Sequence, residues 1–471
     1  MPQASAKLSK VAMLGMLAMG FSIFVIANDF TALSVALPAM EKTFGSDLTT
    51  TQWVINGYAM VFGVCIVTGG RLADMYGRRK IFFLGSTIFA VFSVLGGFAS
   101  EIWMLLVCRA VMGLGGALAW PAILGMTFNL LPENKAGLAG GLILGAAGIG
   151  NAAGPLLGGV LTDTLGWRWI FYVNLPIALV AMLITFFAVG KDQASRADER
   201  IDYKGMTALS LGLFSMLLAL DEGATAGWTS ATILGLFAAS FFFLLVFFFI
   251  ERREGQRALV PDDVMQNRAF ALASLTVLLM SAIFFAALLY LPQYMSRELG
   301  FSAMASGAGL LPMMGTFAAV SFIAGPLYER LGPKLIVSLG AATLAAGMFL
   351  LSRIETGTTF MQLVPGMVVL GIGVGLFYSS ITTTAITALD PSRASLAGAI
   401  VYMFQVAGGS IGLGLNTAIV VSADSIAEGI RRAFLVDATL AVIGLLISLL
   451  FIGGKMNLGH LRHHGQHRAH G

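Results

Sequence analysis

The sequence has few charged residues for its length. Only 11% of its 471 residues are Asp, Glu, Lys or Arg, whereas 57% are hydrophobic. A soluble domain carries roughly 25% charged residues, so water is not the main solvent of this chain. Apolar runs close to the roughly 20 residues that cross a bilayer as a helix follow one another along the sequence. The hydrophilic segments between them are too short for a separate soluble domain.

Histidine and cysteine are also scarce where chemistry would need them. No histidine precedes position 460, so the apolar runs cannot hold a Ser-His-Asp triad or a zinc site. Cys65 and Cys108 lie inside apolar runs, where they are expected as small hydrophobic residues and not as a disulfide or metal pair. A Gly-xxxx-Gly-Lys-Ser/Thr nucleotide loop is missing too. These absences argue against an enzyme, a resident metal or cofactor, and a nucleotide-driven pump.

The basic residues predict an orientation in the membrane. Fourteen apolar runs can be counted, and most of the 28 lysines and arginines fall in loops that share one side with the N-terminus. The positive-inside rule then places both termini in the cytoplasm, as in a multi-pass protein of the cell inner (plasma) membrane. The net charge of +4 is explained by this distribution and implies no nucleic-acid partner.

One segment of the chain recurs in its second half. Glycine, an acid, glycine and a base keep the same spacing in two places, at Gly70, Asp74, Gly77, Arg79 and at Gly325, Glu329, Gly332, Lys334. Such repetition is typical of transporters built from two related halves. We therefore predict an all-α membrane protein with fourteen transmembrane helices, namely two pseudo-symmetric six-helix bundles plus two inserted helices.

The expected domains follow from this repeat. They are an N-terminal bundle at 11–190, linker loops with the inserted pair at 191–267, a C-terminal bundle at 268–455 and a cytoplasmic tail at 456–471. The tail holds all of the histidines, His460, His463, His464, His467 and His470. Without a carboxylate or thiol cluster beside them, a flexible polar tail is favoured over a metal site.

The loop between Gly70 and Lys80 has the composition of a reversible latch between helix ends. Asp74 is expected to cap a helix or to pair with Arg78 or Arg79, and such a charge-assisted contact can break when the two halves move. Ordinary positive-inside charge is the simpler alternative, which the second copy at Glu329 and Gly332 makes less attractive.

Asp29 and Arg109 are charges inside apolar runs. Burying one costs about 2.5–3.5 kcal/mol on insertion scales, so each is a functional candidate by default. Counting from Pro38 and Trp103 places both at a similar depth, where they can meet. Burial favours the protonated acid and a nearby arginine the ionised one, so a movable Asp29 can carry a proton. A permanent structural ion pair and direct binding of a cationic substrate by Asp29 remain open.

Three further acids lie near the ends of apolar runs, and they are Asp221, Glu222 and Asp437. They are expected as solvated helix ends, or else as residues that steer a cationic substrate.

Two further sets of residues complete the candidate site. Gly150, Gly154, Pro155, Gly158 and Gly159 remove side chains and a backbone donor from one helix, which permits close packing and a bend. The substrate pocket is expected to use aromatic and amide side chains, with lipid-facing aromatics as the alternative. These pocket candidates are Trp53, Asn56, Tyr58, Trp120, Tyr290, Tyr378, Phe404 and Gln405.

Four stretches together resemble the major facilitator superfamily. The loop at 70–80 resembles its conserved loop, and Asp29 to Pro38 resembles the first-helix signature of the fourteen-span drug:proton antiporter branch, the multidrug and quaternary ammonium compound exporters. The segment from Arg109 to Gly115 resembles its arginine motif, although Met112 stands where the family usually has Gln. The segment 150–159 resembles its antiporter motif and implies export. Asp29 and Arg109 are then proton-coupling candidates.

The combined expectation is a proton-coupled antiporter that works by alternating access. It would export small amphipathic molecules, either drug-like or lipophilic and cationic, with protons and the bilayer as partners. No cofactor is needed, because the proton gradient drives transport, and a monomer is expected to suffice. The alternatives are an exporter of one specific metabolite and a lipid flippase.

Overall fold

The computed structural model describes residues 9–190, 202–255 and 258–451, and within these ranges the regular structure is helical. The N-terminal helices are α1 (Lys10–Ala32), η1 (Leu33–Val35), α2 (Leu37–Phe44), α3 (Leu48–Tyr76), α4 (Arg78–Gly97), α5 (Ile102–Leu130), η2 (Glu133–Lys135), α6 (Ala136–Thr164) and α7 (Arg168–Ala188). The central helices are α8 (Tyr203–Ala226), α9 (Ala231–Glu254) and α10 (Asp262–Met265). The C-terminal helices are α11 (Arg268–Arg297), α12 (Ala303–Ala308), α13 (Leu311–Leu331), α14 (Pro333–Leu351), α15 (Phe360–Thr387), η4 (Pro391–Arg393), α16 (Ala394–Val421) and α17 (Ile426–Phe451).

Fourteen segments of the described chain are long and apolar enough to cross a membrane. They are built on α1, α3 to α9, α11 and α13 to α17. The short helices α2 and α10 lie between segments, whereas most of α12 belongs to the segment that continues into α13. A helix needs about 20 residues to span the hydrocarbon core, and each segment meets that length within one or two residues or exceeds it. The predicted fold class is confirmed.

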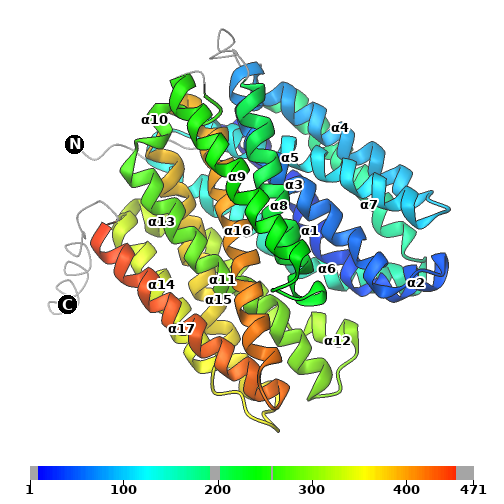
Figure 1. Ribbon diagram of the computed structural model, residues 1–471. Coiled ribbons are helices and arrows are strands. Elements are labelled where there is room, and N and C mark those ends of the chain that lie inside the picture. The colour runs from blue at the N-terminus through cyan, green and yellow to red at the C-terminus, as the bar shows by residue number, and fades with distance from the viewer. Residues whose placement is uncertain (1–8, 191–201, 256–257, 452–471) are drawn as a thin grey trace, which may run out of the picture.

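The long helices form two groups that pack against each other. In Figure 1 the group from α1 to α7 (blue to cyan) lies on the right and the group from α11 to α17 (green to red) on the left. Between the groups, α6 packs along α13 and α3 packs along α16. We call these two contacts the α6/α13 seam and the α3/α16 seam. The boundaries at residues 190 and 268 stay a proposal, and the tail at 456–471 lies outside the described residues.

The inserted helices lie over the α3/α16 seam (Figure 1). α8 packs on both α3 and α16, whereas α9 packs chiefly on α8. Only 11% of the hydrophobic window of α9 is buried inside the protein. Because this window is so apolar and so little covered by protein, α9 is suited to face lipid.

The two copies of the repeat lie at one end of the bundle. We call the end with the turns at Gly77 and Gly332 the basic end, and the other the opposite end. Gly77 has φ 105° and Gly332 has φ 83°. Side chains rarely adopt these angles, so glycine permits the sharp reversals from α3 to α4 and from α13 to α14. The two copies of the repeat therefore make equivalent turns at the same end of the protein.

Candidate functional site

Asp74 connects the two halves at the basic end. It lies in the last turn of α3, and its carboxylate accepts hydrogen bonds from the backbone N–H groups of Ser395 (3.3 Å) and Leu396 (2.9 Å) at the start of α16. First-turn N–H groups have no partner in their own helix, and the helix dipole favours a negative charge there. Asp74 is 3% exposed, so the contact is shielded from water. An acid of the N-terminal half thus caps a helix of the C-terminal half.

Arg78 extends this connection. Its Nε donates to Asp74 Oδ1 at 2.9 Å, while Nη2 donates to the carbonyl of Pro391 at 2.7 Å and Nη1 to that of Gly125 at 3.2 Å. One guanidinium therefore joins α5 and the loop before α16 to the acid. Arg79 points elsewhere, because it donates to the carbonyl oxygens of Val189 (2.8 Å) and Phe186 (2.9 Å) at the end of α7. The first-copy pair is Asp74 with Arg78.

Glu329 makes the corresponding contact from the other half. Its Oε1 accepts a hydrogen bond from the backbone N–H of Leu138, near the start of α6, at 3.2 Å. The backbones also touch here, since a Cβ added to Gly325 would lie 2.5 Å from the carbonyl oxygen of Gly137, and the reverse also holds. At the first copy, a Cβ on Gly70 would lie 2.8 Å from the carbonyl oxygen of Ser395. The basic end is therefore closed by two equivalent sets of contacts.

Asp29 and Arg109 meet inside the N-terminal half. Arg109 Nη1 lies 2.5 Å from Asp29 Oδ2, and both side chains are fully buried. Asn174 on α7 donates to the other carboxylate oxygen at 3.1 Å. The guanidinium carbon also lies 4.2 Å from the ring centroid of Tyr58, a cation–π distance. Side chains of three helices and an aromatic ring thus hold one ion pair, and the two charges meet as the sequence allowed.

The arginine network is thin around Met112. Arg109 Nε donates to the carbonyl of Val54 at 2.6 Å, and Nη1 lies 3.9 Å from the Met112 sulfur, a weak acceptor. Nη2 is buried without a hydrogen-bond partner in the described chain. A glutamine at Met112 would offer an amide oxygen beside these donors.

The glycines of α6 are in contact with two neighbouring helices. A side chain on Gly150 would press on the carbonyl of Phe24, and one on Gly158 would overlap the carbonyl of Ala32, both on α1. Gly154 faces Thr31 on α1, Gly159 faces Met304 on α12, and Pro155 packs against Gly307 of α12. The expected close approach exists, and it ties α6 to α1 in its own half and to α12 in the other.

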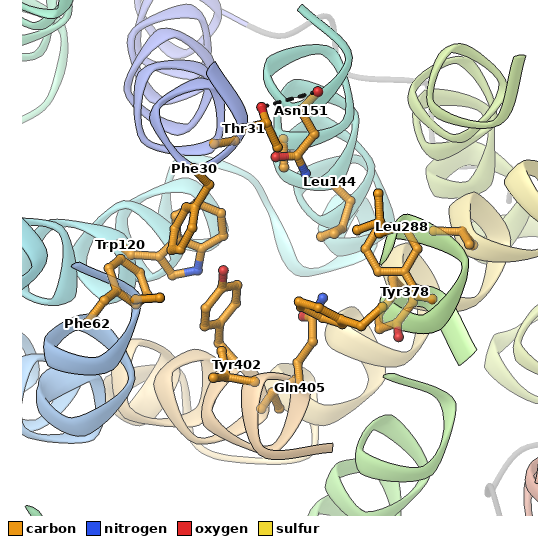
Figure 2. Close-up of a pocket in the computed structure, with 18 of the residues that line it drawn as sticks. Phe30, Thr31, Phe62, Trp120, Leu144, Asn151, Leu288, Tyr378, Tyr402 and Gln405 are labelled. Carbon is orange, nitrogen blue, oxygen red and sulfur yellow. Dashed lines mark hydrogen bonds between the residues drawn. The ribbon is translucent and has the colours of Figure 1, made fainter. Parts of the chain in front are cut away.

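A central cavity of about 410 Å³ lies between the halves. Figure 2 shows Phe30, Phe62 and Trp120 on one side, Leu288 and Tyr378 on the other, and Tyr402 with Gln405 along the edge between them. Thr31 and Asn151 lie at the far side, where the Thr31 hydroxyl donates to the Asn151 carbonyl at 3.3 Å. None of the described residues that line this cavity is charged. The surface is aromatic and apolar with a few hydrogen-bonding groups, as in sites for amphipathic ligands.

The structure separates the pocket candidates into two sets. Asn56, Trp120, Tyr378 and Gln405 line the central cavity, whereas Trp53, Tyr58, Tyr290 and Phe404 are not among its lining residues. Tyr58 lies under Arg109, and the Tyr290 hydroxyl lies 2.7 Å from that of Thr417. The roles of all eight in binding stay a prediction.

Several lining residues were missed from the sequence. Phe30, Thr31, Phe62, Asn151 and Tyr402 face the cavity. Two of them had a usable signal, because Thr31 and Asn151 lie within motifs singled out for other reasons. Tyr402 lies three positions before Gln405 and so shares its helix face. Asn174 was missed as well, because its contact with Asp29 depends on how α7 packs on α1.

A second cavity of about 360 Å³ adjoins the first toward the opposite end. It is formed by α3, α8, α11 and α16. The residues that it shares with the central cavity are Asn56, Ala59, Val406, Ser410 and Leu413. Asp221 of α8 lines it and accepts two hydrogen bonds of 3.0 Å from the Asn56 amide. Trp228 also lines it. We call it the outer cavity, and it combines a carboxylate with an indole ring.

Asp437 is not a solvated helix end, and that expectation was wrong. It lies within α17 and is 0% exposed, because α11, α14 and α16 pack around this helix. Its two carboxylate oxygens accept hydrogen bonds of 3.2 and 3.0 Å from the amide nitrogen of Asn416. Asp221 does lie at an exposed position near the end of its helix.

Within the described residues, no group of three or more His, Cys, Asp or Glu side chains is placed to hold a metal ion.

Two helix groups with a repeated set of contacts at one end and a shared cavity between them form the architecture of a transporter of the Major Facilitator Superfamily. The sequence profile of that family matches residues 19–413 and 273–463, and the chain belongs to it.

Named relatives narrow the comparison. The chain is 32% identical over 418 residues to puromycin resistance protein pur8 of Streptomyces alboniger, which covers 88% of this chain and 81% of that protein. It is 31% identical to multidrug resistance protein Stp of Mycobacterium tuberculosis, over 86% of this chain and 75% of that protein. It is 28% identical to the tetracenomycin C resistance and export protein of Streptomyces glaucescens, with 84% and 74% coverage. The crystal structure of the human organic anion transporter MFSD10 (TETRAN) shares the fold, with a TM-score of 0.65 at 12% identity over 93% of this chain and 98% of that one.

Proposed function

We propose that the protein is a proton-driven exporter of small amphipathic, drug-like compounds, with lipophilic cations among its substrates. The observation that carries the proposal is the central cavity, which both halves line and which is uncharged and aromatic in the described chain. Such a wall binds flat apolar molecules by burying their apolar surface and by aromatic stacking, and not through one fixed set of hydrogen bonds. The resistance and export proteins among the relatives support the same reading.

The proposed cycle is alternating access by movement of one half against the other. The Asp74 and Glu329 contacts close the basic end in this structure, and their release would open it. We assign the basic end to the cytoplasm of an inner-membrane protein with both termini inside, because the arginines of the loops gather there. The protein acts as a monomer in this proposal, without a resident cofactor and without an enzymatic step.

Proton entry is proposed to use the Asp29–Arg109 pair. Asp29 does not line the central cavity, but it pairs with Arg109, whose guanidinium lies over Tyr58. Tyr58 in turn packs on Phe30, which lines the cavity, so one layer of aromatic rings separates the ion pair from it. Movement of α1 against α5 would change the distance between the Asp29 carboxylate and Arg109. The free-energy cost of keeping Asp29 ionised would change with that distance. The outer cavity supports cationic substrates, since Asp221 and Trp228 offer a carboxylate and a ring face to a positive charge.

Inverted membrane vesicles with an imposed pH gradient provide the test. Addition of ethidium or a quaternary ammonium compound should release protons from acidified vesicles that contain the protein and not from vesicles without it. Unrelated lipophilic cations should compete with one another, whereas an exporter of one metabolite would show competition only from close analogues. Movement of a fluorescent lipid in proteoliposomes, without any movement of ethidium, would favour a flippase and overturn the proposal.

A further inference from the structure

Asp437 is a buried acid that the proposed mechanism has not used. It lies near the middle of α17, the red helix of Figure 1, and is 0% exposed. In the described chain, its hydrogen-bond partner is the neutral amide of Asn416. A neutral amide compensates a buried charge poorly, so an ionised carboxylate in this position is costly.

The charged and titratable groups around Asp437 do not supply a counterion. On α17 itself, Arg431 and Arg432 both pair with Glu428 and are about half exposed. On α14, the sole such residue is Lys334, which begins the helix at the basic end.

The other two neighbouring helices present tyrosines to this region. On α16 the titratable residue is Tyr402, which faces the central cavity. On α11, Tyr290 interacts electrostatically with Asp437, and its remaining titratable residues, Arg268, Tyr294 and Arg297, lie in its end turns. Among the residues that the structure describes, no cation lies within ion-pairing distance of Asp437.

The amide beside Asp437 suits both protonation states of the acid. As oriented, Asn416 turns its nitrogen to the carboxylate, while its Oδ1 is buried without a hydrogen-bond partner in the described chain. If Asp437 is protonated, a half-turn of the amide brings that oxygen to accept the new O–H. Oxygen and nitrogen of an amide exchange places in such a turn. The pair therefore holds a ready acceptor for one proton.

The N-terminal half contains a similar buried Asp–Asn pair, which differs in having a counterion. Asp29 also accepts a hydrogen bond from a buried asparagine, Asn174, but it has Arg109 as a counterion in addition. An adjacent arginine stabilises the ionised acid. The two halves thus bury one Asp–Asn pair each, and the C-terminal pair is the one without a positive partner.

A polar route connects the C-terminal pair to the outer cavity. Thr417, which follows Asn416 in the chain, lines that cavity. Its hydroxyl lies 2.7 Å from the hydroxyl of Tyr290. Tyr290 lies near enough to Asp437 for an electrostatic interaction, but in the described chain the two side chains share no hydrogen bond. Two hydroxyl groups can pass a proton by reorientation, so Thr417 and Tyr290 lead from the cavity toward the acid. The last transfer, from Tyr290 to the carboxylate, is part of the proposal below and requires a movement of the Tyr290 side chain.

We propose that Asp437 is a second proton-binding site of the transporter, loaded from the outer cavity through Thr417 and Tyr290 and held by Asn416. A proton joins the carboxylate to form a carboxylic acid when the outer cavity is open to the outside, and it leaves when the movement of the halves exposes the acid toward the basic end. The inference rests on the proposed function of proton-driven export. It adds that export uses one more proton than the Asp29–Arg109 pair alone would carry.

The test compares Asp437→Asn with the wild type in proteoliposomes, with ethidium as the probe. The asparagine has the size of the acid and mimics its neutral form. Ethidium transport driven by a pH gradient should fall about tenfold, within the range of ordinary coupling between two ligands. Exchange of ethidium for ethidium across the membrane, which requires no net proton transfer, should persist. Asp437→Glu should restore part of the driven transport.

A matched control is Asp163→Asn, because Asp163 is an exposed acid at the end of α6. This variant should behave like the wild type in both assays. A proton count supplies a second measurement: purified protein in weakly buffered detergent should release one proton fewer per bound ethidium when Asp437 is replaced.

Each outcome decides between distinct conclusions. An Asp437→Asn protein with unchanged driven transport and unchanged proton count overturns the inference and leaves the proposed function intact. Loss of exchange together with driven transport assigns Asp437 a structural role and also overturns it. If the wild type moves no ethidium under a gradient but exchanges it, the proposed proton coupling itself is wrong, and Asp437 has no proton to contribute.

Discussion

Asp74 and Glu329 cap helices in opposite directions across the same interface. Asp74 of the N-terminal half binds the start of α16, and Glu329 of the C-terminal half binds the start of α6. The two acids occupy equivalent positions of the repeat. The two contacts are related as the two copies of the repeat are, so each half caps a helix of the other.

Removal of one cap should open the basic end more often. A capping contact contributes about 0.5–2 kcal/mol, and a change of one or two kcal/mol alters a two-state ratio by roughly 5–30-fold. We expect Asp74→Asn to raise the labelling rate of a cysteine placed at Ser395, after replacement of Cys65 and Cys108. Glu329→Gln should act in the same direction, and the exposed Asp163→Asn should have no effect. Equal labelling in all variants would show that the acids do not control closure.

The glycine contacts between α1 and α6 should be sensitive to a single methyl group. Gly158→Ala would overlap the backbone carbonyl of Ala32, and overpacking typically costs about 1–3 kcal/mol. Thermal unfolding of the purified protein should therefore occur at a lower temperature. Gly235→Ala provides the control, because nothing lies within 4 Å of its added Cβ on the little-buried helix α9. A similar melting temperature for both variants would contradict the close packing.

Replacement of Asp29 should affect both stability and coupling. Asp29→Asn leaves Arg109 buried without its counterion, which typically costs about 3–5 kcal/mol. The double variant Asp29→Asn with Arg109→Gln should recover much of the stability without recovering driven transport. If the double variant transports ethidium under a pH gradient like the wild type, the pair is structural and carries no proton.

The outer cavity should discriminate substrates by their charge, whereas the central cavity should bind them through their apolar surface area. Asp221→Asn should raise the KM for ethidium by about fivefold, as expected for a partly exposed charge contact worth up to about 1 kcal/mol. It should leave the KM for a neutral drug such as chloramphenicol unchanged. Trp120→Ala should weaken the binding of both substrates and so raise both KM values. Trp103→Ala serves as the control, because Trp103 is 64% exposed. Equal effects of Asp221→Asn on both drugs would contradict the assignment.

The number of spans could be predicted because lipid imposes one long apolar helix per crossing, a pattern that run length and charge reveal directly. The meeting of Asp29 with Arg109 was also accessible, since depth follows from rise per residue. The surroundings of Asp437 were not, because α17 begins at Ile426 and so places the acid near its middle, and the sequence does not reveal which helices pack on it. Tyr58 and Arg79 show the same limit: their residue types were noticed, yet their partners lie on helices far away in the sequence.

The position of α8 determines whether a lipophilic molecule can enter the cavities laterally from the bilayer. Without the inserted pair, the α3/α16 seam beside the outer cavity would border directly on lipid acyl chains. Leu217, Leu220 and Asp221 of α8 instead form the wall there, and along the α6/α13 seam glycine lets the backbones touch. In this conformation α8 and the glycine contacts therefore shield the cavities laterally, and the Asp74 and Glu329 contacts close the basic end. A compound dissolved in the membrane would exchange with the cavities through the opposite end.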